Sequence, residues 1–253
     1  MRKLLTVLGT LLISLSLSAP AMAHFGMLIP GDSIVPQTQK TQTLTLSFSH
    51  PFEGVGMDLV KPASFQVIFE GQSEDLLGSL QEATVMDHKA WTADYQFKRP
   101  GMYIFAFEPE PYPEPAEDNY IIHYTKTVVS GFDDGEDWNQ PIGLKTEIVP
   151  LTRPWGNYAG NCFQGQVLLD GKPAPYTRVE VEYYNKDGAM AAPSDAMITQ
   201  EVLCDGNGVF TFVCPLEGWW GFAGLNDADY QIEGKDVELG AVLWIEMKGY
   251  AKP

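Results

Sequence analysis

Hydrophobic and polar residues alternate along several short stretches of the chain. The alternation is clear over residues 43–50, 91–97, 103–107 and 178–183. A period of two residues is typical of half-buried β-strands, and no stretch of the body has the 3.6-residue period of a long helix. Many short strands between Gly, Pro and Asn turns predict an all-β protein built from antiparallel β-sandwiches.

A proline-rich segment interrupts this pattern near the middle of the chain. Two prolines and a glycine within residues 150–157 end any strand there, so we expect a linker at residues 151–157. The flanking segments, 24–150 and 158–253, each suffice for one sandwich domain. The later segment has the strand, Asp-Gly turn and strand pattern of a small Ig-like or prealbumin-like domain.

The first residues have the pattern of a secretory signal. Two basic residues precede an uncharged apolar stretch over residues 4–18, and residues 21–23 have the small-x-small pattern of a signal-peptidase site. We therefore expect a cleaved signal peptide at residues 1–23 and a mature chain that begins at His24. The apolar stretch is too short for a transmembrane helix, and no later segment is long enough, so we expect a periplasmic protein without direct membrane insertion.

The charge of the chain excludes some classes of partner. The sequence has 33 acidic and 16 basic residues, a net charge of −17, and loss of the two bases in the signal takes it to −19. Nucleic acids and anionic lipids bind to Lys and Arg clusters, so we expect neither as a partner. Metal ions are compatible with this charge. Five carboxylates fall in the proline-rich segment 108–118, which predicts either a cation-collecting loop or an ordinary solvated one.

The three cysteines leave one residue over in any disulfide pairing. Export to an oxidising compartment permits a disulfide. Hairpin spacing puts Cys204 and Cys214 roughly 17 Å apart at about 3.4 Å per residue. A disulfide needs Cα atoms within about 7 Å. Cys162 would therefore pair with one of them, or all three remain thiols.

The four histidines all fall in the first predicted domain and are the candidate metal ligands. Cleavage would give His24 a free α-amine beside its imidazole, and the two groups together can chelate an ion. His50 should point inward, because it continues the parity of apolar residues 44–48. His123 lies in an apolar strand and His88 in a turn. No pair has the spacing of a local metal motif, so the fold must assemble any site, and an ordinary core role stays open for each.

Several sequence blocks together resemble a known family. These blocks are residues 98–103, 108–118, 122–126, 146–154, 165–173 and 218–222. They are similar to the periplasmic component family of ABC-type and energy-coupling-factor cobalt/nickel transport systems, a nickel-uptake family of the domain-of-unknown-function type. The resemblance implies a protein that binds Ni(II) or Co(II) and delivers it to a membrane permease. His24 would contribute amine and ring nitrogens, with His50, His123 and His88 as further ligands.

Two other functions remain open. An N-terminal histidine on a β-sandwich also resembles the histidine brace of copper proteins, which would make the chain a copper chaperone or an oxidative polysaccharide enzyme. Alternatively, the sandwiches form a metal-free carbohydrate-binding or adhesion module. No Gly-rich phosphate loop, Ser elbow or HExxH motif is present. We therefore expect a binding protein and no enzyme.

Overall fold

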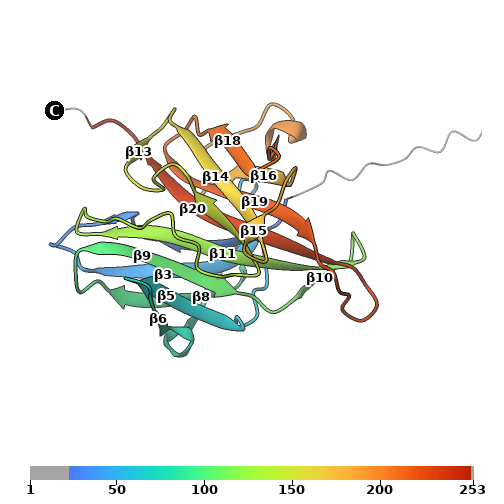
Figure 1. The fold of residues 1–253 in the computed structure, drawn as a ribbon, viewed down its shortest axis with the longest axis horizontal. Helices are drawn as coiled ribbons and strands as arrows, with labels where there is room; N and C mark the ends of the chain where they lie inside the picture. The colour runs from blue at the N-terminus through green and yellow to red at the C-terminus, as the bar shows by residue number, and fades with distance from the viewer. Residues whose placement is uncertain (1–22, 252–253) are drawn as a thin grey trace, which may run out of the picture.

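The computed structural model describes residues 23–251, and these residues form an all-β fold, as predicted (Figure 1). The predicted signal peptide lies outside the described residues except for Ala23. Two short 3-10 helices interrupt the strands, η1 (Leu77–Ser79) and η2 (Asp195–Met197). Within residues 23–251, no helix has the length and apolar character needed to cross a membrane.

The strands form three sheets. The first has five strands in the order β1-β3-β8-β7, with β4 paired to β3. Their bounds are β1 (Phe25–Pro30), β3 (Thr41–His50), β4 (Val55–Met57), β7 (Gln81–Val85) and β8 (His88–Gln96). The smallest sheet has four strands, β12 (Thr146–Pro150), β14 (Cys162–Leu169), β15 (Lys172–Pro173) and β18 (Val209–Val213).

The largest sheet has eleven strands and runs through the whole molecule, in the order β17-β16-β19-β20-β11-β9-β5-β6. The strands from the later half of the chain are β16 (Arg178–Tyr183), β17 (Gln200–Leu203), β19 (Gly218–Asp227) and β20 (Val237–Lys248). Those from the earlier half are β5 (Ser64–Phe69), β6 (Gln72–Asp75), β9 (Gly101–Glu108) and β11 (Asn119–Gly131). The short strands β2 (Ile34–Val35) and β10 (Tyr112–Glu114) pair with β11, and β13 (Asn157–Tyr158) pairs with β20.

Two sandwiches result, and they share the largest sheet. One core packs the five-stranded sheet against β5 and β9, with Leu44, Leu46 and Phe105 fully buried. The other packs the four-stranded sheet against β16, β19 and β20, around Phe163 and Phe222. Figure 1 shows β11 and β20 side by side between the two.

The two halves are joined more closely than the linker at residues 151–157 suggests. Strands β11 and β20 are paired in parallel over eight positions, from Tyr120 with Val237 to Thr127 with Trp244. Strand β12 lies within the predicted first domain, 24–150, yet it pairs with β14 of the later half. The sheets therefore extend across the predicted domain limits, and the division into two domains stays a prediction.

The cysteines are three free thiols in the described structure. Cys162 is exposed, and Cys204 and Cys214 are buried. Cys162 lies opposite Val213 in the β14–β18 ladder, one position away from Cys214. Burial raises the pKa of Cys204 to about 11, which keeps that thiol protonated and unreactive near neutral pH.

Candidate metal centre

His24 and His50 lie together because β1 and β3 are antiparallel neighbours. Phe25, the first residue of β1, is paired with Ser49, so the residue before β1 faces the last residue of β3. The ring centroids of His24 and His50 are 4.6 Å apart. His50 is only 6% exposed, as expected from its inward parity. Pairing of two strands distant in sequence thus assembles the histidine pair.

The carbonyl of Ala23 lies directly beside His50. His50 Nδ1 is 2.8 Å from the Ala23 oxygen. A carbonyl only accepts hydrogen bonds, so Nδ1 carries the proton and donates it. The Ala23 carbonyl carbon is bonded to the His24 nitrogen, the atom that becomes the α-amine if the chain is cut after Ala23. His50 Nδ1 therefore contacts the carbonyl group that is bonded to the His24 nitrogen.

Glu114 completes this group from the proline-rich strand β10. Its Oε2 lies 2.9 Å from His24 Nε2, and both side chains are largely buried. Pairing of β10 with β11, Tyr112 opposite Ile121, brings the carboxylate to the histidines. Since a carboxylate accepts, Nε2 donates, and a neutral His24 ring keeps its lone pair on Nδ1. Nδ1 is the ring nitrogen closer to the backbone nitrogen of the same residue.

His24 is neutral near physiological pH. Burial, together with a smaller effect of the neighbouring His50, lowers the pKa of its imidazole to about 4, although the Glu114 charge acts in the opposite direction. A metal binds the neutral form of imidazole, so no proton has to leave this ring before binding. Burial beside a second histidine thus prepares the ring as a ligand.

His123 is next to this pair but is oriented by other groups. The backbone N–H of Gly26 donates to its Nδ1 at 3.3 Å, and its Nε2 lies 3.6 Å from Glu238 Oε1. The Phe48 ring packs against both His24 and His123. Because Nδ1 accepts, Nε2 carries the proton of the neutral ring and points at Glu238. His123 would have to change tautomer to bind an ion through Nε2.

His88 is placed apart from the other three. It begins β8 and is half-exposed, and its Nδ1 lies 3.1 Å from Asp58 Oδ1. Within residues 23–251, no described ring contact joins it to another histidine. The structure therefore groups His24 and His50 with Glu114, places His123 beside them with Glu238, and leaves His88 with Asp58.

With Ala23 in place, the side chains do not form a closed metal site. Among residues 23–251, no group of three or more His, Cys, Asp and Glu side chains is arranged to hold an ion. Two histidine rings and one backbone nitrogen are the nitrogens that meet near Ala23. A complete donor set therefore depends on that backbone nitrogen becoming an amine.

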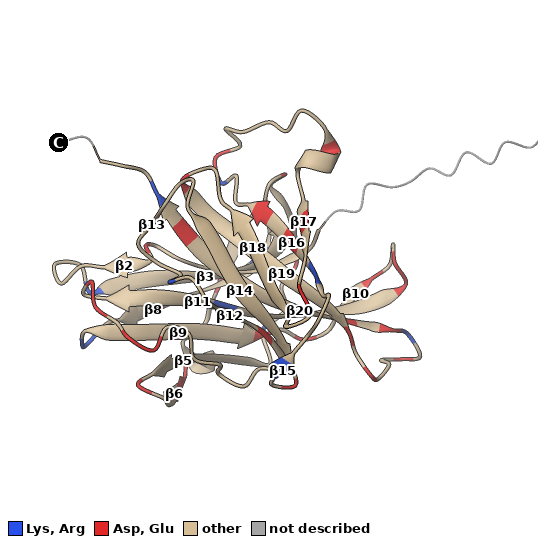
Figure 2. Cartoon of the chain, turned by 45° about the horizontal axis from the view of Figure 1, so that its top comes forward, with Lys and Arg blue, Asp and Glu red and all other residues tan. Residues whose placement is uncertain are grey.

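Carboxylates surround the histidines. Glu238 lies near His123, and burial together with the nearby Glu238 charge raises the pKa of Glu180 to about 7. Figure 2 shows further acidic positions on the loop after β10 and on the hairpin between β19 and β20. Such a field raises the local concentration of cations. No sequence pattern marks Glu114 or Glu238 individually, and the acidic segment 108–118 is the one sign of Glu114.

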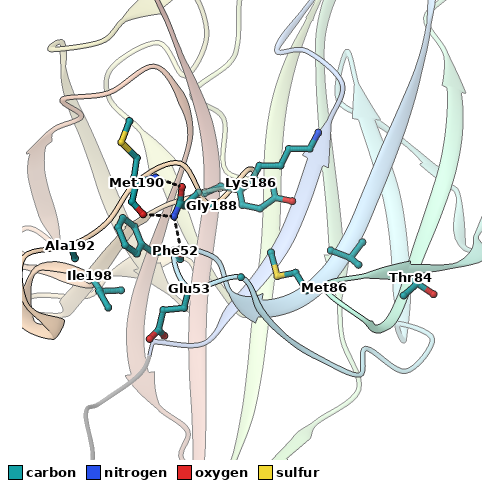
Figure 3. A pocket seen from close by; sticks show the side chains of 13 residues that line it. Phe52, Glu53, Thr84, Met86, Lys186, Gly188, Met190, Ala192 and Ile198 are labelled. Carbon is teal, nitrogen blue, oxygen red and sulfur yellow. Dashed lines mark hydrogen bonds between the residues drawn. The ribbon is translucent and has the colours of Figure 1, made fainter.

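A cleft opens beside Ala23. It has a volume of about 740 Å³, and Phe52, Met86, Tyr184 and Met190 are among the residues that line it (Figure 3). Ala23 packs in the same apolar cluster as Met86 and Tyr184. Phe52 is two residues beyond His50. The cleft therefore borders the segment that follows His50, and its lining does not include His24 or His50 themselves.

Comparisons with known proteins give one family and several distant folds. The profile of a family described as "Domain of unknown function (DUF4198)" matches residues 21–227. No curated protein matches the chain.

Solved structures with similar folds are remote. The chain is 10% identical to latent PorU from Porphyromonas gingivalis, at a TM-score of 0.23, and covers 88% of its own length but 20% of PorU. It is 9% identical to the titin Ig tandem A164–A165, at a TM-score of 0.21, covering 90% of this chain and 100% of that one. It is 11% identical to a two-domain fibronectin type-III segment of chicken tenascin, at a TM-score of 0.21, covering 87% of this chain and 99% of that one. At these scores the likenesses bear on neither ligand nor activity.

Proposed function

The chain belongs to the DUF4198 family of domains of unknown function, and we propose that it is an exported protein that binds one transition-metal ion at His24 and His50. The ion would be held by the His24 α-amine, His24 Nδ1 and the His50 imidazole. The observation that carries the proposal is the 2.8 Å contact between His50 Nδ1 and the Ala23 carbonyl oxygen. This carbonyl is bonded to the His24 nitrogen, which would become the amine. Cleavage after Ala23 would remove that carbonyl and leave its position to an ion.

The chemistry of the donors supports this function. An amine and two imidazoles are borderline nitrogen ligands, which suit Ni, Cu and Zn. The low pKa of His24 keeps its ring neutral, and Glu114 holds the Nε2 proton so that Nδ1 is free. A carboxylate that orients a ligating histidine is a common outer partner in metal sites. His123 with Glu238 would be a supporting pair beside the ion.

We propose Ni(II) or Co(II) as the cargo, carried in the periplasm and passed to a membrane permease. The sequence blocks similar to the nickel-uptake family support this choice. The acidic surface would concentrate the cation near the site. This is a binding and delivery role without catalysis.

Copper is the second candidate, because the nitrogen donor set favours it. Divalent affinity for nitrogen sites rises from Co(II) through Ni(II) to Cu(II). An N-terminal histidine that chelates through amine and Nδ1, with a second imidazole, would then form a histidine brace. A copper chaperone would use the same residues as the nickel carrier and differ in the ion it selects.

Calorimetric titration with Ni(II), Co(II), Cu(II) and Zn(II) tests the proposal. Protein that begins at His24 should bind one ion per chain, and protein that retains Ala23 should bind it at least about 10-fold more weakly, since the amine is blocked. Equal binding by the two forms would rule out amine chelation. Binding of Cu(II) alone would favour the copper protein. The absence of any binding below about 1 mM would leave the metal-free carbohydrate-binding or adhesion module.

Two matched variants locate the ion. His50→Ala should weaken binding by about 10-fold to 100-fold, whereas His88→Ala should leave it unchanged, because His88 pairs with Asp58 elsewhere. The reverse result would place the ion at His88 instead. Circular dichroism of both variants shows whether the fold is retained.

A further inference from the structure

Lys126 and Glu147 form a completely buried pair between two sheets. Lys126 belongs to β11 of the eleven-stranded sheet and Glu147 to β12 of the four-stranded sheet. Lys126 Nζ is 2.6 Å from Glu147 Oε2, and each side chain is 1% exposed. Lys126 follows His123 by three residues on β11, and the pair has no part in the proposed metal site.

The lysine is poorly satisfied as an ammonium ion. Burial lowers the pKa of the Lys126 amine, and the nearby Glu147 opposes this effect. An ammonium group has three N–H donors, but among residues 23–251 Glu147 is its one hydrogen-bond partner. A buried charge with unpaired donors carries a desolvation cost of several kcal/mol. A nitrogen with fewer protons would fit this environment better.

The glutamate is held in a position that favours attack on its carbon. The backbone N–H groups of Gly143 and Ile142 donate to Oε1 at 2.9 and 3.1 Å. The Ile142 N–H is also 3.1 Å from Oε2. Two backbone donors on Oε1 resemble the oxyanion hole of an acyl-transfer site, because they stabilise negative charge on that oxygen. Oε2 is the oxygen nearest the amine.

We propose that Lys126 and Glu147 condense to an intramolecular isopeptide bond between Nζ and Cδ. A proton first passes from the ammonium to Oε2, which leaves a neutral amine and a carboxylic acid. The Nζ lone pair attacks Cδ, and Oε1 takes the negative charge against the Gly143 and Ile142 N–H groups. A second proton passes from nitrogen to Oε2, the Cδ–Oε2 bond breaks, and one water leaves. The step involves no oxidation and needs no co-reactant.

The product fits the site better than the ion pair does. Condensation removes two buried charges and leaves one N–H on the nitrogen in place of three. Oε1 remains a carbonyl oxygen that accepts from both backbone donors. Tyr124 and Val128, which share the face of β11 with Lys126, are almost fully buried apolar neighbours. Water for the reverse reaction would have to enter this core.

Intact mass spectrometry of the denatured, mature protein tests the proposal. The mass should be lower than that of the sequence by one water. Trypsin should fail to cut after Lys126, and it should release residues 99–145 joined to residues 146–178. A mass equal to that of the sequence would overturn the proposal, as would a missing water that maps to other residues.

The chain contains its own comparison pair. Lys145 and Asp170 also form a close ion pair, with 2.9 Å between Nζ and Oδ1, but both are partly solvated, so their peptides should show no linkage. The Lys126→Met variant should have the full mass of its sequence. A variant that still lacks one water would show that the loss arises elsewhere and would reject the bond.

Discussion

At the scale of single residues, hydrogen bonds decide which nitrogens of the histidines are available. Glu114 accepts a hydrogen bond from His24 Nε2, and the Ala23 carbonyl accepts one from His50 Nδ1. The first contact leaves His24 Nδ1 free beside the backbone nitrogen. The second connects His50 to the bond that signal cleavage would cut. A cut after Ala23 would therefore remove the partner of His50 and leave the contact of His24 with Glu114 in place.

Removal of the Glu114 charge should weaken metal binding without touching a ligand. In Glu114→Gln, an amide replaces the carboxylate that orients His24, so we expect affinity to fall by about 10-fold to 100-fold. Glu110→Gln, an exposed position in the same segment, serves as the control. Titration of both variants with the preferred ion measures the effect. Equal affinities would show that Glu114 does not orient the ring.

The sequence predicts the orientation of some of these residues but not the contacts of others. The inward direction of His50 could be predicted, because strand parity extends to the end of β3. The contact of His24 with Glu114 could not be predicted. It depends on strand β10, which lies more than 85 residues after His24 in the chain and is positioned by its pairing with β11. Glu238 could not be predicted for the same reason, because pairing of β20 with β11 brings it to His123.

At the scale of elements, β16 shows what alternation leaves out. The predicted strand at residues 178–183 coincides with Arg178–Tyr183, and Val179 and Val181 face the core. Its polar face is exposed at Arg178 but covered at Glu182. The Glu182 carboxylate is buried, accepts a hydrogen bond from Thr199 Oγ1 and lies against the Phe52 N–H at 3.3 Å. Periodicity shows which residues share a face, whereas tertiary packing decides whether that face meets water.

Glu182 should make the protein less stable as the pH rises. Burial raises its pKa from 4.5 to about 7, so between these values the folded state binds a proton that the unfolded state has released. Stability therefore falls from pH 4.5 to 7, by at most about 3 kcal/mol for this group. Glu182→Gln should lose that part of the pH dependence, whereas exposed Glu201→Gln should keep it. Urea unfolding at several pH values measures both, and parallel pH curves would contradict the prediction.

The junction between β11 and β20 depends on a glycine. Gly240 lies opposite His123, and a Cβ atom there would come within 2.6 Å of His123 Nε2 and even closer to Cδ2. The ring is 1% exposed, so it would have to shift within the core. Gly240→Ala should therefore destabilise the fold by about 1–3 kcal/mol through overpacking. Gly78→Ala has open space around its Cβ and serves as the control. Thermal unfolding compares the two, and equal midpoints would contradict the close packing.

At the scale of the whole molecule, the sequence showed two sandwiches but not how they are joined. The break at residues 151–157 is real as a change of pattern, since two prolines and a glycine lie in or next to it. Parallel pairing of β11 with β20 joins strands more than 100 residues apart, and no local signal marks it. One core cluster also contains Met102 and Val128 from the earlier half together with Val167 from the later half. The joined sheet is therefore a property of the folded molecule.

This joined architecture predicts that the two halves unfold as one unit. Separation of the sandwiches would break eight paired positions between β11 and β20. It would also take Met102, Ile104 and Val128 out of the core of the later half, which is then incomplete. Differential scanning calorimetry should give one transition, with a ratio of calorimetric to van't Hoff enthalpy of about 1. Gly240→Ala should lower this single transition without splitting it. Two resolved transitions would mean that the halves unfold independently. Faster hydrogen exchange throughout β8 than in β14 would mean the same, and the shared sheet would then be less stable than either core.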